Sequence, residues 1–183
     1  PYSYVTRDEA QKLATKMNYM NCTSSLLFGI QWDLTLKYIE AKNATSQEKL
    51  KSDGEMIGNY LNSEFILNRG KFEEYGFPAY WYNFDSEEKT NLVEKCKKKA
   101  QTEFSKGILL TTGATDMTKL QNIYDIAGNV WEWTLEFYDN NYPCTLRGGS
   151  FANNSSESAQ YHAYNNDSFY NDGVGFRIGL WEE

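Results

Sequence analysis

Cysteine and histidine are the residue types best suited to bind a transition metal or to act as nucleophile and base, and both are scarce in this chain. The three cysteines, Cys22, Cys96 and Cys144, are widely spaced, form no C-x-x-C pair and allow one disulfide at most. The single histidine, His162, excludes a multi-histidine metal site. It stands in a polar segment without the signature of a nucleophile elbow. The sequence therefore predicts neither a thiolate metal centre nor a Ser/His/Asp triad.

The segment from Phe151 to Gly173, which contains that histidine, offers binding chemistry instead. It has no Lys, Arg, Met or Trp and is rich in Asn, Ser, Tyr and Asp. Tyrosine supplies rigid amphipathic contact area, and Ser, Asn and Gly supply adaptable hydrogen bonds, as in antibody paratopes. The alternative interpretation is a polar loop without a special role. On the first interpretation the ligand-binding residues are Asn153, Asn154, Ser158, Tyr161, His162, Tyr164, Asn165, Asn166, Asp167, Phe169 and Tyr170.

Three short stretches rich in glycine, tryptophan and arginine surround this segment. They read N-I-Y-D-I-A-G-N-V-W-E-W (Asn122–Trp133), R-G-G-S (Arg147–Ser150) and G-F-R (Gly175–Arg177). In the first, Trp131 and Trp133 alternate with Glu132, so a strand would place the tryptophans on one sheet face and Glu132 on the other. Each tryptophan buries a large area and needs a partner for its indole N–H. These residues are predicted to belong to the core.

Glycine, asparagine and arginine in the same stretches predict particular backbone and side-chain geometry. Gly128 permits backbone angles closed to other residues, and Asn129 tolerates the left-handed region. Paired glycines such as Gly148-Gly149 let strands approach or bulge. Arg147 and Arg177 are predicted to act as forks that tie loops to the core by bidentate hydrogen bonds.

In this order and at this spacing, the three stretches closely resemble the formylglycine-generating enzyme (sulfatase-modifying factor) family, whose catalytic domain is a variant of the C-type lectin fold. The resemblance covers roughly Thr6 to Leu180, densely after Asn122 and thinly before it. It implies an α+β, C-type lectin fold of the formylglycine-generating enzyme-like variant, with two N-terminal helices, an antiparallel β-sheet and long irregular loops. We expect a single such domain over residues 1–183.

The resemblance also implies a calcium site. In the family, the Asn and Glu of the G-N-V-W-E-W stretch hold Ca²⁺ together with backbone carbonyls, and Asn129 and Glu132 match those positions. Oxygen ligands are what a hard cation needs. The alternative is that Glu132 pairs with a backbone amide or with an arginine of the fold.

The family's catalytic residues, in contrast, have no counterpart in this chain. The enzymes bind copper(I) for oxygen chemistry through two cysteines four residues apart, between the positions of Arg147 and the C-terminus. No cysteine stands between Arg147 and Glu183, and Cys144 precedes that region without a partner. Thiolate metal chemistry fails for want of ligands. We therefore expect that the protein has the fold of these enzymes without their catalytic activity. The one cofactor that we expect is calcium at Asn129 and Glu132.

The composition of residues 151–173 resembles the variable proteins of diversity-generating retroelements. In those proteins, adenine-directed mutagenesis rewrites Asn-type codons of a C-terminal window into a set that excludes Lys, Glu, Gln, Met and Trp. Only Glu157 and Gln160 of the segment fall outside that set. The resemblance implies a ligand-binding protein that recognises a protein or cell-surface ligand, on a virion tail or a bacterial cell surface. The alternatives are a formylglycine-generating-type oxidoreductase and an inactive relative with a structural role.

Two helices are predicted to come first in the chain. Thr6-Arg7-Asp8-Glu9 is a capping box, and Ala10, Leu13, Ala14 and Met17 follow on one helical face. A second helix is predicted from Ser24-Ser25 to about Lys42. Its apolar residues occupy more than one stripe, which is typical of a buried helix.

The rest of the chain predicts loops, one charged helix and then strands. Expected loops are 42–54, which is polar, and 75–84, whose aromatic run could equally form a ligand wall. A charged helix is expected at 87–104. Strands are expected at 108–110, 131–137, 145–150 and 174–180. Helices first and strands later, without βαβ alternation, indicate an α+β fold with an antiparallel sheet.

Length and charge exclude several classes of function. A chain of 183 residues can bury its own core, and 18 Lys plus Arg within a net charge of −7 leave no basic footprint for nucleic acid. An anionic membrane surface would repel the chain, and no run of residues approaches the length that spans a bilayer. The chain starts at Pro1 rather than Met, so removal of an upstream segment stays open, as does the oligomeric state.

Overall fold

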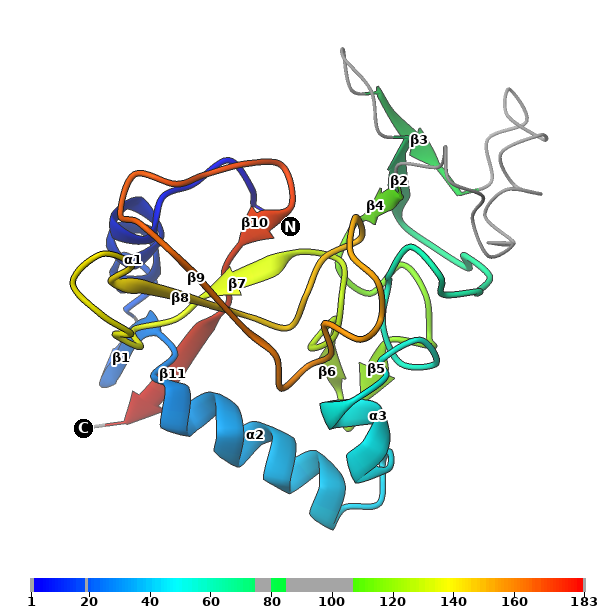
Figure 1. The fold of residues 1–183 in the computed structure, drawn as a ribbon, viewed down its shortest axis with the longest axis horizontal. Coiled ribbons are helices and arrows are strands. Elements are labelled where there is room, and N and C mark those ends of the chain that lie inside the picture. The colour runs from blue at the N-terminus through cyan, green and yellow to red at the C-terminus, as the bar shows by residue number, and fades with distance from the viewer. Residues whose placement is uncertain (1, 19, 75–79, 85–106, 183) are drawn as a thin grey trace.

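The computed structural model describes residues 2–18, 20–74, 80–84 and 107–182, and it is a mixed α+β structure (Figure 1). Its helices are α1 (Arg7–Thr15), α2 (Gly29–Ala41) and α3 (Gln47–Lys51). Its strands are β1 (Cys22–Leu26), β2 (Lys71–Glu74), β3 (Tyr80–Asn83), β4 (Ile108–Leu110), β5 (Lys119–Leu120), β6 (Ile123–Tyr124), β7 (Trp131–Trp133), β8 (Cys144–Arg147), β9 (His162–Asn165), β10 (Val174–Gly175) and β11 (Ile178–Glu182).

Helix α1 forms where the capping box predicted it. The Thr6 hydroxyl accepts from the backbone of Glu9 while the Glu9 carboxylate accepts from the backbone of Thr6, so both free amides are satisfied. Ala10 and Ala14 are buried in the core. The predicted apolar face extends one turn too far, because the helix ends at Thr15 and Met17 lies exposed beyond it.

The second helix begins later than predicted, at Gly29 rather than at Ser24-Ser25. Residues 22–26 form β1 instead, which pairs antiparallel with the last strand, β11. The Ser24 hydroxyl donates to the carbonyl of Ala14 at 2.6 Å, which ties this strand to the end of α1. A strand partner at the far end of the chain therefore overrides the local helical pattern.

Helix α2 is buried on one side only, so the prediction of a helix buried on most sides is wrong. Trp32, Leu36 and Ile39 face the core. Ile30 and Leu34, which lie between them in the sequence, are exposed. Figure 1 shows the reason, since α2 lies along the outside of the molecule below β11 and no other described element covers its outer side.

The strands form four small sheets among the described residues, rather than the single antiparallel sheet that was expected. The central sheet has the order β10-β7-β8-β9, and within it β10 runs parallel to β7 while the other pairs are antiparallel. The predicted strands at 131–137, 145–150 and 174–180 are shorter or divided. The outer sheets are β1-β11, β3-β2-β4 and β5-β6.

Between the N-terminal helices and the C-terminal strands, some of the observed elements differ from those predicted. Strand β4 lies where Ile108–Leu110 predicted it. The predicted loop 42–54 contains α3, which buries Leu50, and the aromatic run contributes β3. The rest of that run and the predicted helix 87–104 lie largely outside the described residues. Within the described part of the chain, no helix is long and apolar enough to cross a membrane.

Candidate functional site

Arg147 on β8 is fully buried and joins four separate parts of the chain. Its Nε and Nη2 donate to the two oxygens of Glu136 at 2.7 and 2.8 Å, Nη2 also reaches Asp33 on α2, and Nη1 reaches the carbonyl of Gln160. Burial pushes the pKa of Glu136 upward, but the Arg147 guanidinium outweighs it and holds that pKa below its usual value. The predicted bidentate fork is confirmed at this position.

Arg177 makes a second fork inside a cage of oxygen atoms. Its Nε and Nη2 bind both oxygens of Glu132, and Nη2 also donates to the carbonyls of Tyr124 and Asp125. Its guanidinium carbon lies 5.5 Å from the ring centre of Trp32, which covers it. Burial alone would lower the pKa of Arg177, but the Glu132 charge outweighs burial and raises it. The alternative in which Glu132 pairs with an arginine is therefore confirmed.

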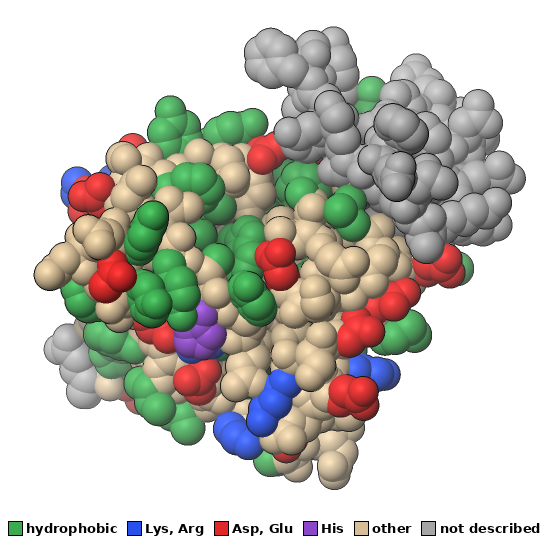
Figure 2. Space-filling model, viewed as in Figure 1, with side chains coloured by type: hydrophobic (Ala, Val, Ile, Leu, Met, Phe, Trp, Pro, Cys, Tyr) green, Lys and Arg blue, Asp and Glu red, His purple; other side chains and the backbone are tan. Residues whose placement is uncertain are grey.

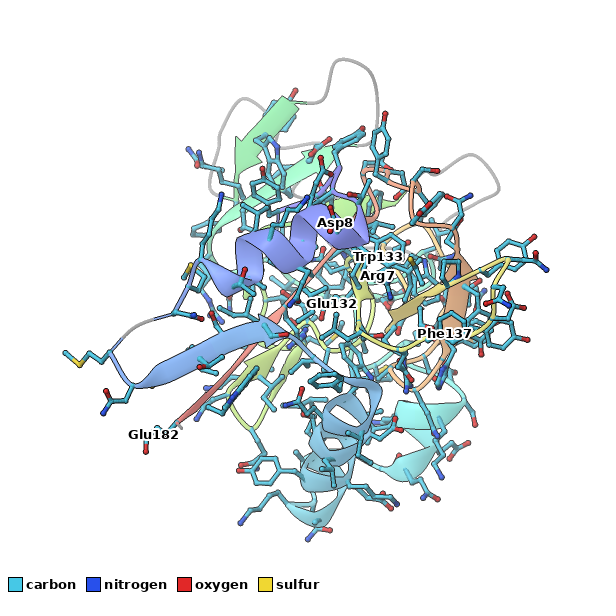
Figure 3. All side chains as sticks on the ribbon, turned by 90° about the vertical axis from the view of Figure 1, so that its left-hand side faces the viewer. Arg7, Asp8, Glu132, Trp133, Phe137 and Glu182 are labelled. Atoms are coloured by element: carbon cyan, nitrogen blue, oxygen red, sulfur yellow. The ribbon has the colours of Figure 1, made fainter. Side chains whose placement is uncertain are left out.

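The tryptophans of β7 find the indole partners that the sequence required. Trp133 donates to the carbonyl of Val5 at 2.8 Å, and Trp131 donates to the side-chain oxygen of Asn153 at 2.9 Å. Both rings belong to one core cluster with Leu146. Figure 3 shows Glu132 and Trp133 in the middle of the molecule, where they hold the central sheet to its neighbours.

The residues matched to the family's calcium ligands do not fit a calcium ion in this arrangement. The side-chain oxygen of Asn129 accepts from the backbone N–H of Leu110 at 3.0 Å and from Asn59 at 3.1 Å, and Glu132 is held by Arg177. Asp125 retains one buried oxygen without a partner, which is a single ligand. Among the described residues no group of three or more His, Cys, Asp or Glu could hold a metal ion. The Arg177 guanidinium fills the cage where a cation would sit.

Backbone geometry explains why glycine and asparagine occupy positions 128 and 129, in the turn before β7. Both have positive φ, 67° and 65°, as the sequence predicted for this pair. A Cβ on Gly128 would lie 2.4 Å from the carbonyl oxygen of Asn59, so only glycine allows the two chain segments to meet. The turn thereby delivers the Asn129 side chain to β4.

The described cysteines do not form a metal pair. Cys22 and Cys144 are both free, and Cys144 is buried in the core cluster of β8, where burial raises the pKa of its thiol. Cys96 lies outside the described residues.

The predicted ligand-binding residues divide into three that support the fold and eight that lie at or near the surface. Ser158 is fully buried, which corrects its assignment as a ligand contact. Asn153 accepts from Trp131 and from the backbone of Ser150, and Phe169 packs edge-on against Trp133. The exposed or half-buried remainder comprises Asn154, Tyr161, His162, Tyr164, Asn165, Asn166, Asp167 and Tyr170.

Neighbouring residues of strand β9 alternate between packing against the core and lying at the surface. Ala163 packs toward the core, so His162 and Tyr164 on either side of it point outward. The Tyr164 ring stacks on Tyr138 with centroids 3.7 Å apart and planes 16° apart. Tyr161 immediately precedes the strand, and its ring centre lies 6.1 Å from that of Trp131. We call Tyr138, Tyr161, His162 and Tyr164 the tyrosine face.

Sequence reasoning missed Tyr138, which lies on the connection between β7 and β8. The signal was the run L-E-F-Y-D-N-N-Y at 135–142, where aromatic residues alternate with turn formers. Figure 3 shows Phe137 of the same connection at the outer edge of the molecule. In Figure 2, hydrophobic side chains gather around the histidine on the side of the molecule that carries β8 and β9.

His162 connects the tyrosine face to the buried arginine beneath it. Its Nδ1 lies 3.8 Å from an oxygen of Glu136. Burial lowers the pKa of His162, and the nearby Arg147 charge lowers it further. The imidazole therefore loses its proton more readily than that of a free histidine.

Together these features define a loop-rich α+β protein whose small sheets are held together by buried arginine–glutamate pairs. The family model described as FGE-sulfatase, the sulfatase-modifying factor enzyme 1-like domain, matches residues 73–180. The match spans more than half of the chain, so the chain belongs to this family. No curated protein sequence matches it.

Proposed function

We propose that this protein binds a protein or cell-surface ligand through residues 151–173 and the adjoining 135–142 connection. The observation that carries the proposal is the tyrosine face, in which Tyr138, Tyr161 and Tyr164 are 53%, 47% and 39% exposed. Tyrosine dominates interface hot spots because it buries much area at little entropic cost. The stack of Tyr138 on Tyr164 fixes both rings at the surface, so little entropy is lost when a partner covers them.

The proposal also includes the C-type lectin fold and the absence of catalysis. Support for the fold comes from the family membership together with the two N-terminal helices and the pairing of the N- and C-terminal strands. Support for the absence of catalysis comes from the sequence, in which no cysteine follows Arg147. Turnover of a cysteine-bearing sulfatase peptide, under oxygen and with copper, would contradict this proposal.

Diversification by a retroelement belongs to the proposal as its most specific element. Its support is the composition of residues 151–173 and the separation of exposed from buried positions within them. Related copies should vary at Asn154, Tyr161, Tyr164 and Tyr170, and should keep Ser158 unchanged. A template repeat and a reverse transcriptase beside the gene are the expected genomic companions. Variation spread evenly over the chain would contradict diversification and leave ligand binding in place.

The experiment that tests ligand binding compares capture of purified bacterial envelope proteins by three immobilised forms of the chain. The parent and Tyr38→Ala, which truncates an exposed tyrosine of α2, should retain the same envelope protein. The double variant Tyr161→Ala/Tyr164→Ala should lose it. Equal capture by all three forms would remove the tyrosine face as the binding surface.

A further inference from the structure

We infer that the tyrosine face recognises arginine side chains of a partner protein, an inference that rests on the proposed binding function and names its ligand chemistry. The partner would present a basic segment whose guanidinium groups lie flat on the exposed rings. Three observations lead to this assignment. The rings are stacked, the charge around them is negative, and no lysine or arginine among the described residues lies over them.

The rings offer the flat, accessible surface that a guanidinium needs. Tyr138 and Tyr164 stack at 3.7 Å and remain 53% and 39% exposed, so part of each ring is accessible. The His162 ring lies 6.3 Å from Tyr164 and extends the surface along β9. A planar cation within about 6 Å of an aromatic centre is attracted by the ring's quadrupole. Guanidinium stacks on such rings better than an ammonium does.

The surroundings of the rings are acidic. The connection 134–142 and the segment 151–173 contain no lysine or arginine. Glu136, Asp139 and Asp167 are the acidic residues close in sequence to Tyr138 and Tyr164. Beneath the rings the single charge of Arg147 meets two carboxylates, Glu136 and Asp33, so this cluster keeps one negative charge in excess. Arg7 lies at the margin and donates to the carbonyl of Pro143.

Three aromatic rings elsewhere in the described structure have cations from the same chain. Arg177 lies over Trp32, Arg69 and Lys119 lie near the Tyr124 ring, and Lys42 lies over Tyr38. Among the described residues, no such cation lies over a ring of the tyrosine face. Acidic surroundings with open rings are complementary to a cation supplied from outside. A neutral saccharide could use the rings and donate hydroxyl hydrogen bonds to the carboxylates, but it would lack the charge attraction that a guanidinium gains.

The test selects a display library of random dodecapeptides on the immobilised full chain, with counter-selection on Tyr138→Ala/Tyr164→Ala. Face-dependent peptides should be enriched in arginine. Synthetic copies of them should lose at least tenfold in affinity when arginine is replaced by citrulline, which has the same shape without the charge. Replacement by lysine should cost less than replacement by citrulline.

Two further variants complete the design. Tyr38→Ala, whose ring is already covered by Lys42, should bind the selected peptides as the parent does. Asp167→Asn removes an exposed charge near the end of β9 and should weaken arginine peptides but not their citrulline copies. This second variant gives the answer if the double tyrosine variant unfolds.

Each outcome decides between the two proposals. Face-dependent peptides without arginine, or citrulline copies that bind as well as the originals, would overturn the arginine inference and leave the binding function standing. A selection that yields no face-dependent peptide would overturn both. Arginine peptides whose binding ignores Tyr138→Ala/Tyr164→Ala and Asp167→Asn would show that bulk charge attracts them, which also overturns the inference.

Discussion

The Arg147 fork lies beneath the tyrosine face, and both arginine forks are built on the opposite principle from that face. Arg147 and Arg177 are tied by bidentate ion pairs to Glu136 and Glu132, with further bonds to backbone carbonyls. The tyrosine face, in contrast, makes ring contacts and is open to water. Strand β9 shows the same division between neighbouring residues, since Ala163 packs inward while Tyr164 points outward.

This difference separates stability from recognition at the level of single residues. A buried ion pair is costly to break, because the remaining charge is left without a partner in a dry environment. An exposed ring can be exchanged at little cost, since water replaces its contacts. The protein can therefore change its outer side chains while the arginine forks keep the strands in place.

The largest expected effect comes from removing a core ring beside the forks. Trp133→Ala should lower the free energy of unfolding by about 3–5 kcal/mol, because it leaves a cavity and deprives the Val5 carbonyl of its donor. Denaturant unfolding measures the change. Trp81→Ala, which truncates an exposed tryptophan on β3, is the matched control and should cost far less. Equal losses at the two tryptophans would contradict the assignment of Trp133 to the core.

The next effect concerns the second fork. Arg177→Ala should cost about 3–5 kcal/mol, because Glu132 would stay buried without its partner. Arg69→Ala removes one partner of an exposed pair with Asp116 and should leave the melting temperature nearly unchanged. If both arginines proved equally dispensable, the forks would not be what holds the sheets together.

Much of the fold around the two forks could be predicted from the sequence, because the signals for it are local. Alternation placed Trp131 and Trp133 in one cluster, a capping box placed α1, and G-N fixed two residues of positive φ. What the sequence missed depends on distant partners. Residues 22–26 become a strand only because β11 pairs with them. Tyr138 joins the tyrosine face only because β8 and β9 bring Tyr164 beside it.

A third prediction uses acid to weaken the first fork. The pKa of Glu136 is lowered in the folded protein, so the unfolded chain takes up this proton first as the pH falls. The stability that Glu136 contributes is therefore present above its ordinary pKa of 4.5 and is lost as the pH falls through its folded value. Unfolding experiments between pH 7 and pH 3 measure this. Glu136→Gln should be less stable at pH 7 and should show a shallower acid decline; an unchanged decline would argue against the pair.

The tyrosine face should show a much smaller stability effect. Tyr161→Ala and Tyr164→Ala should each change the free energy of unfolding by about 0.5 kcal/mol or less, because their rings are largely exposed. The internal control is Phe169→Ala, in the same segment, which removes a ring packed on Trp133 and should cost more. A loss at Tyr164 as large as at Phe169 would mean that the face supports the fold and is not free to vary.

Calcium should have the smallest effect on the melting temperature. The experiment tests whether Arg177, and not a metal ion, occupies the oxygen atoms around it. A ligand that binds only the folded state raises the melting temperature by mass action. The parent should melt at the same temperature across micromolar to millimolar calcium, with or without chelator, because the Arg177 guanidinium already occupies Glu132 and the carbonyls of Tyr124 and Asp125. Arg177→Ala is the informative contrast. It frees those oxygens beside the unpartnered oxygen of Asp125, so calcium should recover part of its lost melting temperature. A calcium-dependent rise in the parent itself would show that the cage holds a metal ion together with its arginine.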